Sequence, residues 1–577
     1  MKIFKSGAIA FCCSLLISCG GGSSETSEPQ TYAKIVTNSS SITESSLNKL
    51  SVTTNLDDIY TVTWSQESGP KTYFFVNADN TLSFIAPNVT EDAQIVFTAN
   101  LSADGKSSLI AKAPLTITNT VVPRINEMPK PNVFASSNYT KHYIREFDSA
   151  GIPLLERENN EFYYYPVTIA AYGYDLYRAL YDFHLSKGEE NAEIQGKLIA
   201  VANWLRDNCV YTDYGFCSYR SYFKYDAYKL DTDWTTAMGQ GQAISVLVAA
   251  HYLTGDESYG QVAHDALSAF LYPLEVKGLT ADFEGDVWYE EYGSVEMPNH
   301  ILNGFLFALS GIYDFTRNYH DELSVDIFNT GVTSLVNKID KFDWHFTSRY
   351  SYGPLFQLAS TLKGPDAYHE LHVYQLAWLY NLTREEKIKE YTAKFLAQDM
   401  AGLKMINKFY PGTTKILNVE ASSTINSTNF GPDRLFDGYW SIRNYWSSYR
   451  FPVDLTISLA DNFVDAGVLN KLVLTSTTPE DFPTSFTLLE VLDSGEERVL
   501  KENITKENTE HIEYFHEVDV HKSYTVTFTL DIPTTSNTLK LIIYGTNEGL
   551  VRLRELDIQY PREALLEKTI DVYTKKL

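Results

Sequence analysis

The sequence predicts a multidomain protein with a β-sandwich at each end and an all-α region between them. Its 577 residues exceed one domain, because domains hold about 150 residues on average, so three or four are expected. Apolar and polar residues alternate at first, apolar residues then recur three and four positions apart, and the alternation finally returns. Alternation is typical of strands and the longer spacing is typical of helices. The two changes therefore mark two domain boundaries.

The composition is acidic and rich in tyrosine. The chain contains 47 Lys and Arg against 73 Asp and Glu, a formal net charge of −26. This balance weakens long-range attraction to nucleic acid and to anionic membranes, so we expect no nucleic-acid partner. An acidic substrate would need a locally basic cleft. The 40 tyrosines carry rings with a polar edge, which suits sugar stacking and proton transfer as well as core packing.

Residues 1–18 predict a lipoprotein signal peptide, and residues 19–31 a flexible tether. Lys2 and Lys5 precede an apolar run that ends in Leu16-Ile17-Ser18-Cys19-Gly20, a pattern typical of secretory signals. The ending resembles a bacterial lipobox. The resemblance implies a lipid on Cys19 and an exported lipoprotein of the cell envelope, at the periplasmic or surface face of the outer membrane, with the lipid as its membrane contact. An ordinary signal peptide with a chance cysteine is the alternative.

Two cysteines, Cys209 and Cys217, remain after the export signal, since Cys12 and Cys13 lie in the signal peptide and Cys19 is the expected lipid site. In an oxidising compartment this pair predicts one local disulfide, and it is too isolated for a metal site. Two buried free thiols are the alternative.

Residues 32–121 predict an immunoglobulin-like β-sandwich. Short alternating runs such as YTVTW (60–64) and QIVFTANL (94–101) are separated by turn signals. WSQESGP followed by FIAPNVTEDAQIVFTA resembles surface modules of the polycystic-kidney-disease type, which implies a spacer or a carbohydrate-contacting role.

Residues 122–412 predict the all-α domain. Segments 243–253, 301–315 and 372–382 each place apolar residues three and four apart, as helices with a buried stripe do. Successive helices with little strand signal between them favour helical hairpins that close into an (α/α) toroid. An open solenoid is the alternative.

Residues 413–560 predict a second β-sandwich, with strands such as DLTISLAD (454–461) and TLKLIIYG (538–545). FDGYWSIRNYWSS (436–448) and VRLRELDIQY (551–560) resemble discoidin-like, galactose-binding modules of jelly-roll form. That resemblance implies a carbohydrate-binding module. Residues 561–577 predict a C-terminal helix.

Five motifs of the central domain occur in a fixed order. They are YYYPVTIAAYG (163–173), TDWTTAMGQGQAIS (232–245), WYEEY (288–292), LNGFLFALSGIYD (302–314) and YHELHVYQL (368–376). Together they resemble the catalytic C-terminal domain of D-glucuronyl C5-epimerases over about residues 160–400. The resemblance implies an isomerase that converts D-glucuronate to L-iduronate in a heparosan-like chain, with a polyanionic uronate polysaccharide as its partner and no redox cofactor.

Inversion at C5 requires removal of a proton from one face of the sugar and delivery to the other, so two acid/base groups must flank the ring. Donors must also stabilise the carbanion that forms beside the carboxylate. A tyrosine, with a pKa of about 10, is a ready donor at neutral pH, whereas an ionised glutamate is a ready base.

The family pattern implies four catalytic residues: Glu291, Tyr292, Tyr350 and Tyr368. We assign Glu291 and Tyr368 as the proton-transfer pair, with Tyr292 and Tyr350 bonding the carboxylate or relaying protons. The chain departs from the family's Asp-Leu-Arg after the middle tyrosine. Arg349 is the candidate for the missing cation, and a register in which Tyr352 is the functional ring stays open.

Further residues are candidates for substrate binding. They are Tyr165, Gln240, Gln242, Asn303, Arg349, His369 and His372. Extended chain points neighbouring side chains in opposite directions, so Glu290 is expected to be structural, as a cap or an arginine partner. His369 and His372 lack the HExxH spacing, so we expect no metal site, and the sequence does not support a structural Ca²⁺.

Two other functions compete with epimerisation. A polysaccharide lyase would begin by abstracting the same C5 proton, and a surface glycan-binding lipoprotein would retain the fold without catalysis. A glycoside hydrolase needs separated carboxylates, which the adjacent Glu290 and Glu291 do not supply. The oligomeric state is open, with a homodimer as one option.

Overall fold

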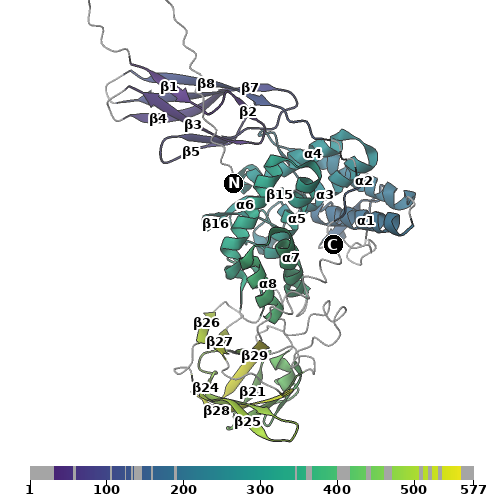
Figure 1. The fold of residues 1–577 in the computed structure, drawn as a ribbon, viewed down its shortest axis with the longest axis vertical. Coiled ribbons are helices and arrows are strands. Elements are labelled where there is room, and N and C mark those ends of the chain that lie inside the picture. Colours follow the sequence, from purple (N-terminus) through teal and green to yellow (C-terminus); the bar gives the residue numbers. More distant parts are fainter. Residues whose placement is uncertain are drawn as a thin grey trace, which may run out of the picture.

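The computed structural model arranges the chain as two β-sandwiches on either side of a helical region (Figure 1). It describes residues 31–55, 60–103, 107–123, 125, 127–131, 134, 146–157, 160–187, 191–344, 347–355, 357–358, 367–398, 416–436, 444–459, 471–505, 511–516, 523–529 and 536–559. The predicted signal peptide, Cys19, nearly all of the tether and the helix over 561–577 lie outside these residues.

The N-terminal β-sandwich consists of two four-stranded sheets, ordered β1-β3-β6-β5 and β2-β8-β7-β4. Alternate residues of β7, such as Ile95 and Phe97, are fully buried between the sheets, as the alternating pattern predicts. The strands are β1 (Ala33–Val36), β2 (Ser41–Thr43), β3 (Leu47–Thr54), β4 (Thr61–Ser68), β5 (Phe74–Val76), β6 (Leu82–Ile85), β7 (Ala93–Ser102) and β8 (Leu109–Thr118). The finer immunoglobulin-like assignment stays a prediction.

The described part of the central region contains eight α-helices in four consecutive pairs. They are α1 (Pro166–Lys187), α2 (Ala192–Asn208), α3 (Ala237–Thr254), α4 (Glu257–Ser268), α5 (Leu302–Tyr319), α6 (Glu322–Lys338), α7 (Ala367–Thr383) and α8 (Glu386–Gln398). The odd-numbered helices contact one another in the series α1-α3-α5-α7, and each packs against the even-numbered helix that follows it. The region is therefore helical and two-layered, and its closure into a toroid stays a prediction.

The odd-numbered helices run parallel. The Ser245 hydroxyl, eight residues into α3, donates to Asp314 in α5 at 2.8 Å, and the Tyr174 hydroxyl, eight residues into α1, donates to the same carboxylate at 3.3 Å. Near the helix starts, the Tyr165 and Trp234 rings that precede α1 and α3 lie 5.9 Å apart. In α5 and α7, the Tyr313 and Trp378 rings, each eleven residues after the start of its helix, lie 6.1 Å apart. Residues at similar distances from the helix starts are therefore in contact, and all four N-terminal ends lie at one end of the layer.

The α3 and α5 backbones touch at glycines. A Cβ on Gly241 would lie 2.8 Å from Ala308 Cα, and one on Gly311 would overlap the carbonyl of Gly241. Any larger side chain at either position would push the two helices apart. The crossing of α3 and α5 is thus fixed by these two glycines.

Short strands before α1 and between the later helices lie around the N-terminal ends of the odd-numbered helices. They are β9 (Glu146–Phe147), β10 (Pro153–Arg157), β11 (Glu161–Tyr163), β12 (Val210–Tyr211), β13 (Cys217–Ser218), β14 (Arg220–Ser221), β15 (Trp234–Thr235), β16 (Thr280–Phe283), β17 (Asp286–Tyr289), β18 (Arg349–Ser351) and β19 (Gln357–Leu358).

The C-terminal β-sandwich has two five-stranded sheets, ordered β20-β22-β28-β24-β25 and β21-β29-β23-β27-β26. Its strands are β20 (Ile416–Ala421), β21 (Trp446–Ser448), β22 (Val453–Leu459), β23 (Lys471–Ser476), β24 (Pro483–Val491), β25 (Glu497–Ile504), β26 (His511–His516), β27 (Ser523–Thr529), β28 (Thr538–Thr546) and β29 (Val551–Gln559). The second predicted sandwich is thereby confirmed as a two-sheet structure. Across the described residues, no helix is both long enough and apolar enough to cross a bilayer.

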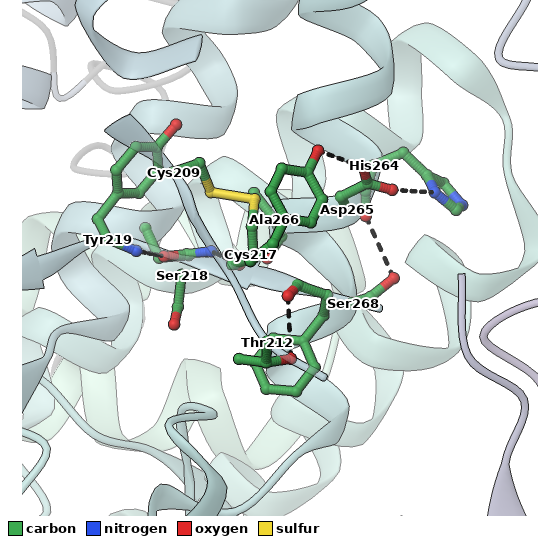
Figure 2. Close-up of a disulfide and its surroundings, with 12 residues drawn as sticks. Cys209, Thr212, Cys217, Ser218, Tyr219, His264, Asp265, Ala266 and Ser268 are labelled. Carbon is green, nitrogen blue, oxygen red and sulfur yellow. Dashed lines mark hydrogen bonds and ion pairs between the residues drawn. A yellow bond between two sulfur atoms is a disulfide. The ribbon is translucent and has the colours of Figure 1, made fainter. Parts of the chain in front are cut away.

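The predicted disulfide is confirmed. Cys209, directly after α2, is bonded to Cys217 in β13, with a Cα–Cα distance of 5.5 Å (Figure 2). The Gln240 amide, near the start of α3, donates to the Cys217 carbonyl at 2.9 Å. The covalent link therefore anchors a hairpin that is itself hydrogen-bonded to an inner helix.

Replacing Cys209 and Cys217 with serine is expected to lower the free energy of unfolding by about 2 to 3 kcal/mol, because the link closes a short loop in the unfolded chain. Urea denaturation of the full chain measures the effect. Either single serine variant should lose about as much as the double variant, since each breaks the same bond. A double variant that unfolds at the wild-type urea concentration would contradict this.

Candidate functional site

Glu291 lies in a loop that the backbone holds against the start of α3. The loop follows β17, and the backbone N–H of Glu290 donates to Leu279 O at 2.9 Å. The N–H of Ala237, the first residue of α3, donates to Glu290 O at 2.8 Å. These bonds fix the direction in which the neighbouring Glu291 side chain points.

Glu290 is structural, as expected, although its partner is a histidine rather than an arginine. Its carboxylate is fully buried and lies 2.6 Å from His300 Nδ1, and it also accepts the His300 backbone N–H at 3.3 Å. The His300 ring stacks on Phe283 with centroids 4.2 Å apart. The Glu290 side chain therefore connects two chain segments and is not available to a substrate.

Glu291 is buried to 4% exposure and faces the tyrosines. The Tyr350 hydroxyl lies 3.4 Å from Glu291 Oε1 as a weak donor. On the other side, a Cβ on Gly304 of α5 would stand 2.5 Å from Glu291 Cβ and 2.7 Å from its Cδ. The Glu291 side chain therefore occupies space that only a glycine at position 304 leaves open.

The four predicted catalytic residues lie together. The Tyr350 and Tyr368 rings meet edge to face with centroids 4.7 Å apart. Tyr292 stacks on Tyr228 at 4.0 Å. Tyr165 belongs to the same group, because the charge of Glu291 acts on its pKa. We call the following seven residues the tyrosine cluster: Tyr165, Tyr225, Tyr228, Glu291, Tyr292, Tyr350 and Tyr368.

Burial and the charge of Glu291 keep the tyrosines protonated. Desolvation, followed by Glu291, raises the pKa of Tyr350 and of Tyr292 well above the ordinary value. The same two causes raise the pKa of Tyr368 to about 12, while its interaction with the Tyr350 hydroxyl acts in the opposite direction. At neutral pH these tyrosines are proton donors. The acidic member of the cluster is Glu291.

The position of the cluster adds a favourable field for negative charge. It lies at the end where α1, α3, α5 and α7 begin, and Gly304 is the third residue of α5. Helix N-terminal ends carry partial positive charge and free N–H groups. An anion held against Glu291 and the tyrosines would meet this field.

Arg349 is separated from the cluster. Its guanidinium packs 4.8 Å from the Tyr352 ring and 5.3 Å from the Trp344 ring, and burial lowers its pKa to about 10. Successive residues of β18 point to opposite faces, so Tyr350 faces Glu291 while Arg349 does not. Tyr352 packs on Phe283 at 5.3 Å, away from Glu291. The geometry therefore favours Tyr350 over Tyr352 as the functional ring.

Gln240 binds backbone rather than open space. Its carbonyl accepts Tyr219 N at 3.0 Å, and its amide donates to Cys217 O and Ala266 O, each at 2.9 Å. Because these bonds engage both the oxygen and the nitrogen of the Gln240 side-chain amide, the predicted contact of Gln240 with a sugar does not fit this arrangement. Gln240 instead holds the strand that leads into the tyrosine-rich segment after Tyr219.

His369 is likewise bonded on both ring nitrogens. Nδ1 accepts the Ser348 backbone N–H at 2.9 Å, and Nε2 lies 2.7 Å from Phe395 O, which fixes a neutral ring. His372 is fully buried, lies 2.7 Å from the Ser348 hydroxyl, and has a pKa that burial lowers well below its ordinary value. Both histidines support the chain just before Tyr350. His369 has no ring nitrogen left for a sugar, whereas His372 Nε2 has no hydrogen-bond partner in the described residues.

Two predicted substrate-binding residues are buried with one unpartnered oxygen each. Gln242 Oε1 and Asn303 Oδ1 accept no hydrogen bond from any group in the described residues. The backbone carbonyl of Asn303 accepts a hydrogen bond from the Gln375 side-chain amide at 3.1 Å, which connects α5 to α7. Asn303 precedes Gly304 directly, so of the two it is the nearer to Glu291 in the chain.

Sequence reasoning missed Tyr225 and Tyr228. Tyr228 stacks on Tyr292, and Tyr225 lies 5.5 Å from the Tyr292 ring centroid. The signal was present in SYRSYFKYDAY (218–228), where a tyrosine recurs at every third position. Such a run of rings in a loop is a candidate lining for a sugar site.

Several cations near the motifs are already paired with carboxylates. Arg206, Arg220 and Lys224 form ion pairs with Asp207, Asp233 and Asp231. Arg157 is different, since its guanidinium lies 5.0 Å over the Tyr225 ring. Among the described residues, no group of His, Cys, Asp and Glu has the arrangement of a metal site.

A cavity in the described part of the chain lies elsewhere. It has a volume of about 1140 Å³ and is bounded by the N-terminal β-sandwich, α4, α6 and the β16–β17 hairpin. The described residues that line it include Glu44, Asp286, Asp321, Glu322 and Asp326, and none of these described residues is a lysine or an arginine. A polyanion would be repelled from this cavity. The chemistry of the tyrosine cluster, rather than cavity size, identifies the candidate active site.

Residues 212–397 match the family model for the D-glucuronyl C5-epimerase C-terminus. This segment, which holds Glu291, Tyr292, Tyr350 and Tyr368, belongs to that family. A D-glucuronyl C5-epimerase of Caenorhabditis elegans is 30% identical over 179 residues, which cover 28% of this chain and 28% of the relative. A protein of Methanocaldococcus jannaschii without an assigned function is 30% identical over 184 residues, covering 31% of this chain and 57% of the relative. The chain thus spans well under two thirds of either relative.

Solved structures similar to part of the chain are carbohydrate-binding modules. A family 32 module from Streptococcus pneumoniae is 15% identical with a TM-score of 0.19, covering 26% of this chain and 94% of that one. A family 32 module from C. perfringens, solved with galactose, is 15% identical with a TM-score of 0.18, covering 25% and 98%. At these values we infer no ligand from the likeness.

Gly304→Ala is expected to lower the free energy of unfolding by about 1 to 3 kcal/mol, because the new methyl group must displace the buried Glu291 side chain. Gly196→Ala in α2 is the matched control. A Cβ there has no heavy atom within 4 Å, so it should stabilise the helix by about 0.5 to 1 kcal/mol. Urea denaturation compares the two variants. If the two substitutions changed the free energy of unfolding equally, the position of the Glu291 side chain against Gly304 would be contradicted.

Proposed function

We propose that the protein is a polysaccharide uronate C5-epimerase, which converts D-glucuronate to L-iduronate residues within a heparosan-like chain. The observation that carries the proposal is one arrangement: a buried carboxylate, Glu291, and a half-buried tyrosine, Tyr368, on either side of Tyr350. The pair supplies a base and an acid that need no cofactor. The family of residues 212–397 supports the same reaction class.

In the forward direction, Glu291 takes the C5 proton from one face of the uronate. The electron pair left on C5 delocalises into the adjacent carboxylate, and Tyr368 delivers its phenolic proton to C5 from the opposite face. Glu291 is then protonated and Tyr368 is a tyrosinate. The product differs from the substrate only in its configuration at C5.

Tyr350 can return the enzyme to its starting state. Its hydroxyl lies 3.4 Å from Glu291 Oε1, and its ring contacts that of Tyr368. It can therefore pass its proton to the Tyr368 oxygen and accept one from Glu291. This relay restores a carboxylate and a phenol after each turnover without requiring water inside the site.

The intermediate is stabilised by groups that stay protonated. It carries two negative charges on one carboxylate-derived unit, so donors aimed at it lower the barrier more than they help the ground state. Tyr292 and Tyr165 have pKa values that burial and Glu291 raise well above the ordinary value, and both keep their protons at neutral pH. The nearby helix N-terminal ends add to this stabilisation.

We also propose that the protein is exported to the bacterial cell envelope and held there by a lipid on Cys19. Its partner is a polyanionic uronate polysaccharide, which the two β-sandwiches position or grip. A lyase would share the first step and then eliminate the 4-linked group, so unsaturated uronate in place of inverted uronate would identify it.

Glu291→Gln and Tyr368→Phe are each expected to lower C5 hydrogen exchange on heparosan in D₂O by at least about a hundredfold, because each removes one proton-transfer group. NMR of the polymer measures deuterium at C5. Tyr352→Phe is the matched control: it removes a tyrosine hydroxyl two residues from Tyr350 and should stay within about twofold of wild type. Wild-type exchange in both of the first two variants would refute the assignment.

We expect Tyr368 to remain protonated, and so to act as the acid catalyst, far into alkaline solution. Because the pKa of Tyr368 is raised to about 12, its donor form is lost only as the pH rises through that value. A free tyrosine would lose half of its protons at about pH 10. The profile of kcat/KM should therefore show no decline from this group between about pH 7 and pH 10. A midpoint below pH 10, with the protein still folded by circular dichroism, would contradict the role.

A further inference from the structure

The proposed reaction places a carboxylate substrate in a protein of strongly negative charge, yet the cation that the sequence offered for it is turned away. Arg349 packs between Trp344 and Tyr352 on the far face of β18. An anionic sugar still needs a positive group to offset the charge of Glu291. The following inference rests on the proposed function and identifies that group.

Arg157, the last residue of β10, lies at the edge of the tyrosine cluster. Its guanidinium sits 5.0 Å over the Tyr225 ring and 5.1 Å over the Phe223 ring. Nη2 donates to the Lys224 carbonyl at 3.2 Å. Two aromatic faces and one backbone bond therefore fix the plane of the guanidinium, which reduces the entropy lost when it binds a ligand.

The remaining donors of Arg157 are not used by acidic side chains. A guanidinium has five N–H donors, and within the described residues no carboxylate forms an ion pair with this one. Glu161, opposite it in the β10–β11 hairpin, instead accepts the Tyr163 hydroxyl at 2.5 Å. The side chain is half-buried, so its outer edge reaches solvent.

Electrostatic effects connect Arg157 to the reacting groups. Its positive charge lowers the pKa of Tyr165, against the larger raising effects of burial and of Glu291. Its ring partner Tyr225 contacts Tyr292 and acts on the pKa of Tyr368. Arg157 thus approaches the cluster from the β10–β11 hairpin.

We propose that Arg157 is the specificity-determining residue that binds a substrate carboxylate by a two-pronged hydrogen-bonded ion pair. A planar guanidinium held over two aromatic rings matches a carboxylate in shape and charge. The partly buried Tyr225 ring beside it can also contact the sugar ring. Arg157 thereby selects uronate polymers over neutral glycans.

The test compares Arg157→Gln and Arg157→Lys with Lys224→Gln in the full chain. Lys224→Gln removes an equal charge from a nearby exposed residue that is paired with Asp231, and it leaves the carbonyl that Arg157 uses. We expect Arg157→Gln to weaken binding of a uronate oligosaccharide by about ten- to a hundredfold, with a smaller salt dependence. Arg157→Lys should recover only part of the affinity, because an ammonium cannot form both bonds. Lys224→Gln should stay within about twofold of wild type.

A second ligand separates carboxylate recognition from general damage to the site. The same oligosaccharide with its carboxylates reduced to alcohols should bind wild type and Arg157→Gln with equal affinity, measured by calorimetry. Loss of affinity for both ligands, or for neither, would overturn the inference. If wild type binds uronate through Arg157 but exchanges no C5 hydrogen, the inference stands and the proposed epimerase activity fails.

Discussion

The close contact between α3 and α5 is the constraint on which the site depends. Gly241 and Gly311 let the two helix backbones touch, and the parallel packing then brings the starts of both helices to the same level. Gly304 at the start of α5 leaves the space that Glu291 fills, while Ala237 at the start of α3 holds the Glu290 carbonyl. The carboxylate is thus positioned by two helices rather than by a mobile loop.

Burial of this carboxylate among tyrosines determines what each group can do. In water a glutamate and a tyrosine titrate about six pH units apart, and the cluster keeps their roles distinct because burial and the Glu291 charge raise the tyrosine pKa values further. A base therefore faces several protonated donors at neutral pH. That asymmetry suits a reaction in which a proton leaves one face of a sugar and another arrives on the opposite face.

Charge is distributed unevenly over the helical region. The cavity beside the N-terminal β-sandwich has five acidic residues in its described lining, whereas the tyrosine cluster has Arg157 at its edge and lies at the N-terminal ends of helices. A polyanion would be guided away from the first and toward the second. The Gln240 side-chain amide and both ring nitrogens of His369 are bonded within the protein. The tyrosines and Arg157 are the groups that we propose to meet a ligand.

The sequence by itself determined the order of the three regions, the disulfide between Cys209 and Cys217, and the grouping of Glu291 with Tyr292, Tyr350 and Tyr368, because periodicity, cysteine count and motif order are local properties of the chain. Only the tertiary structure decided which side chains face the site. A motif does not reveal direction, so Gln240 and His369 looked like ligands until their hydrogen bonds to the backbone were known. Arg349 is one residue from Tyr350 yet faces the other side of its strand, whereas Arg157 is distant in sequence and lies on Tyr225. Contacts between segments far apart in the chain depend on packing, and that information is absent from any single stretch of sequence.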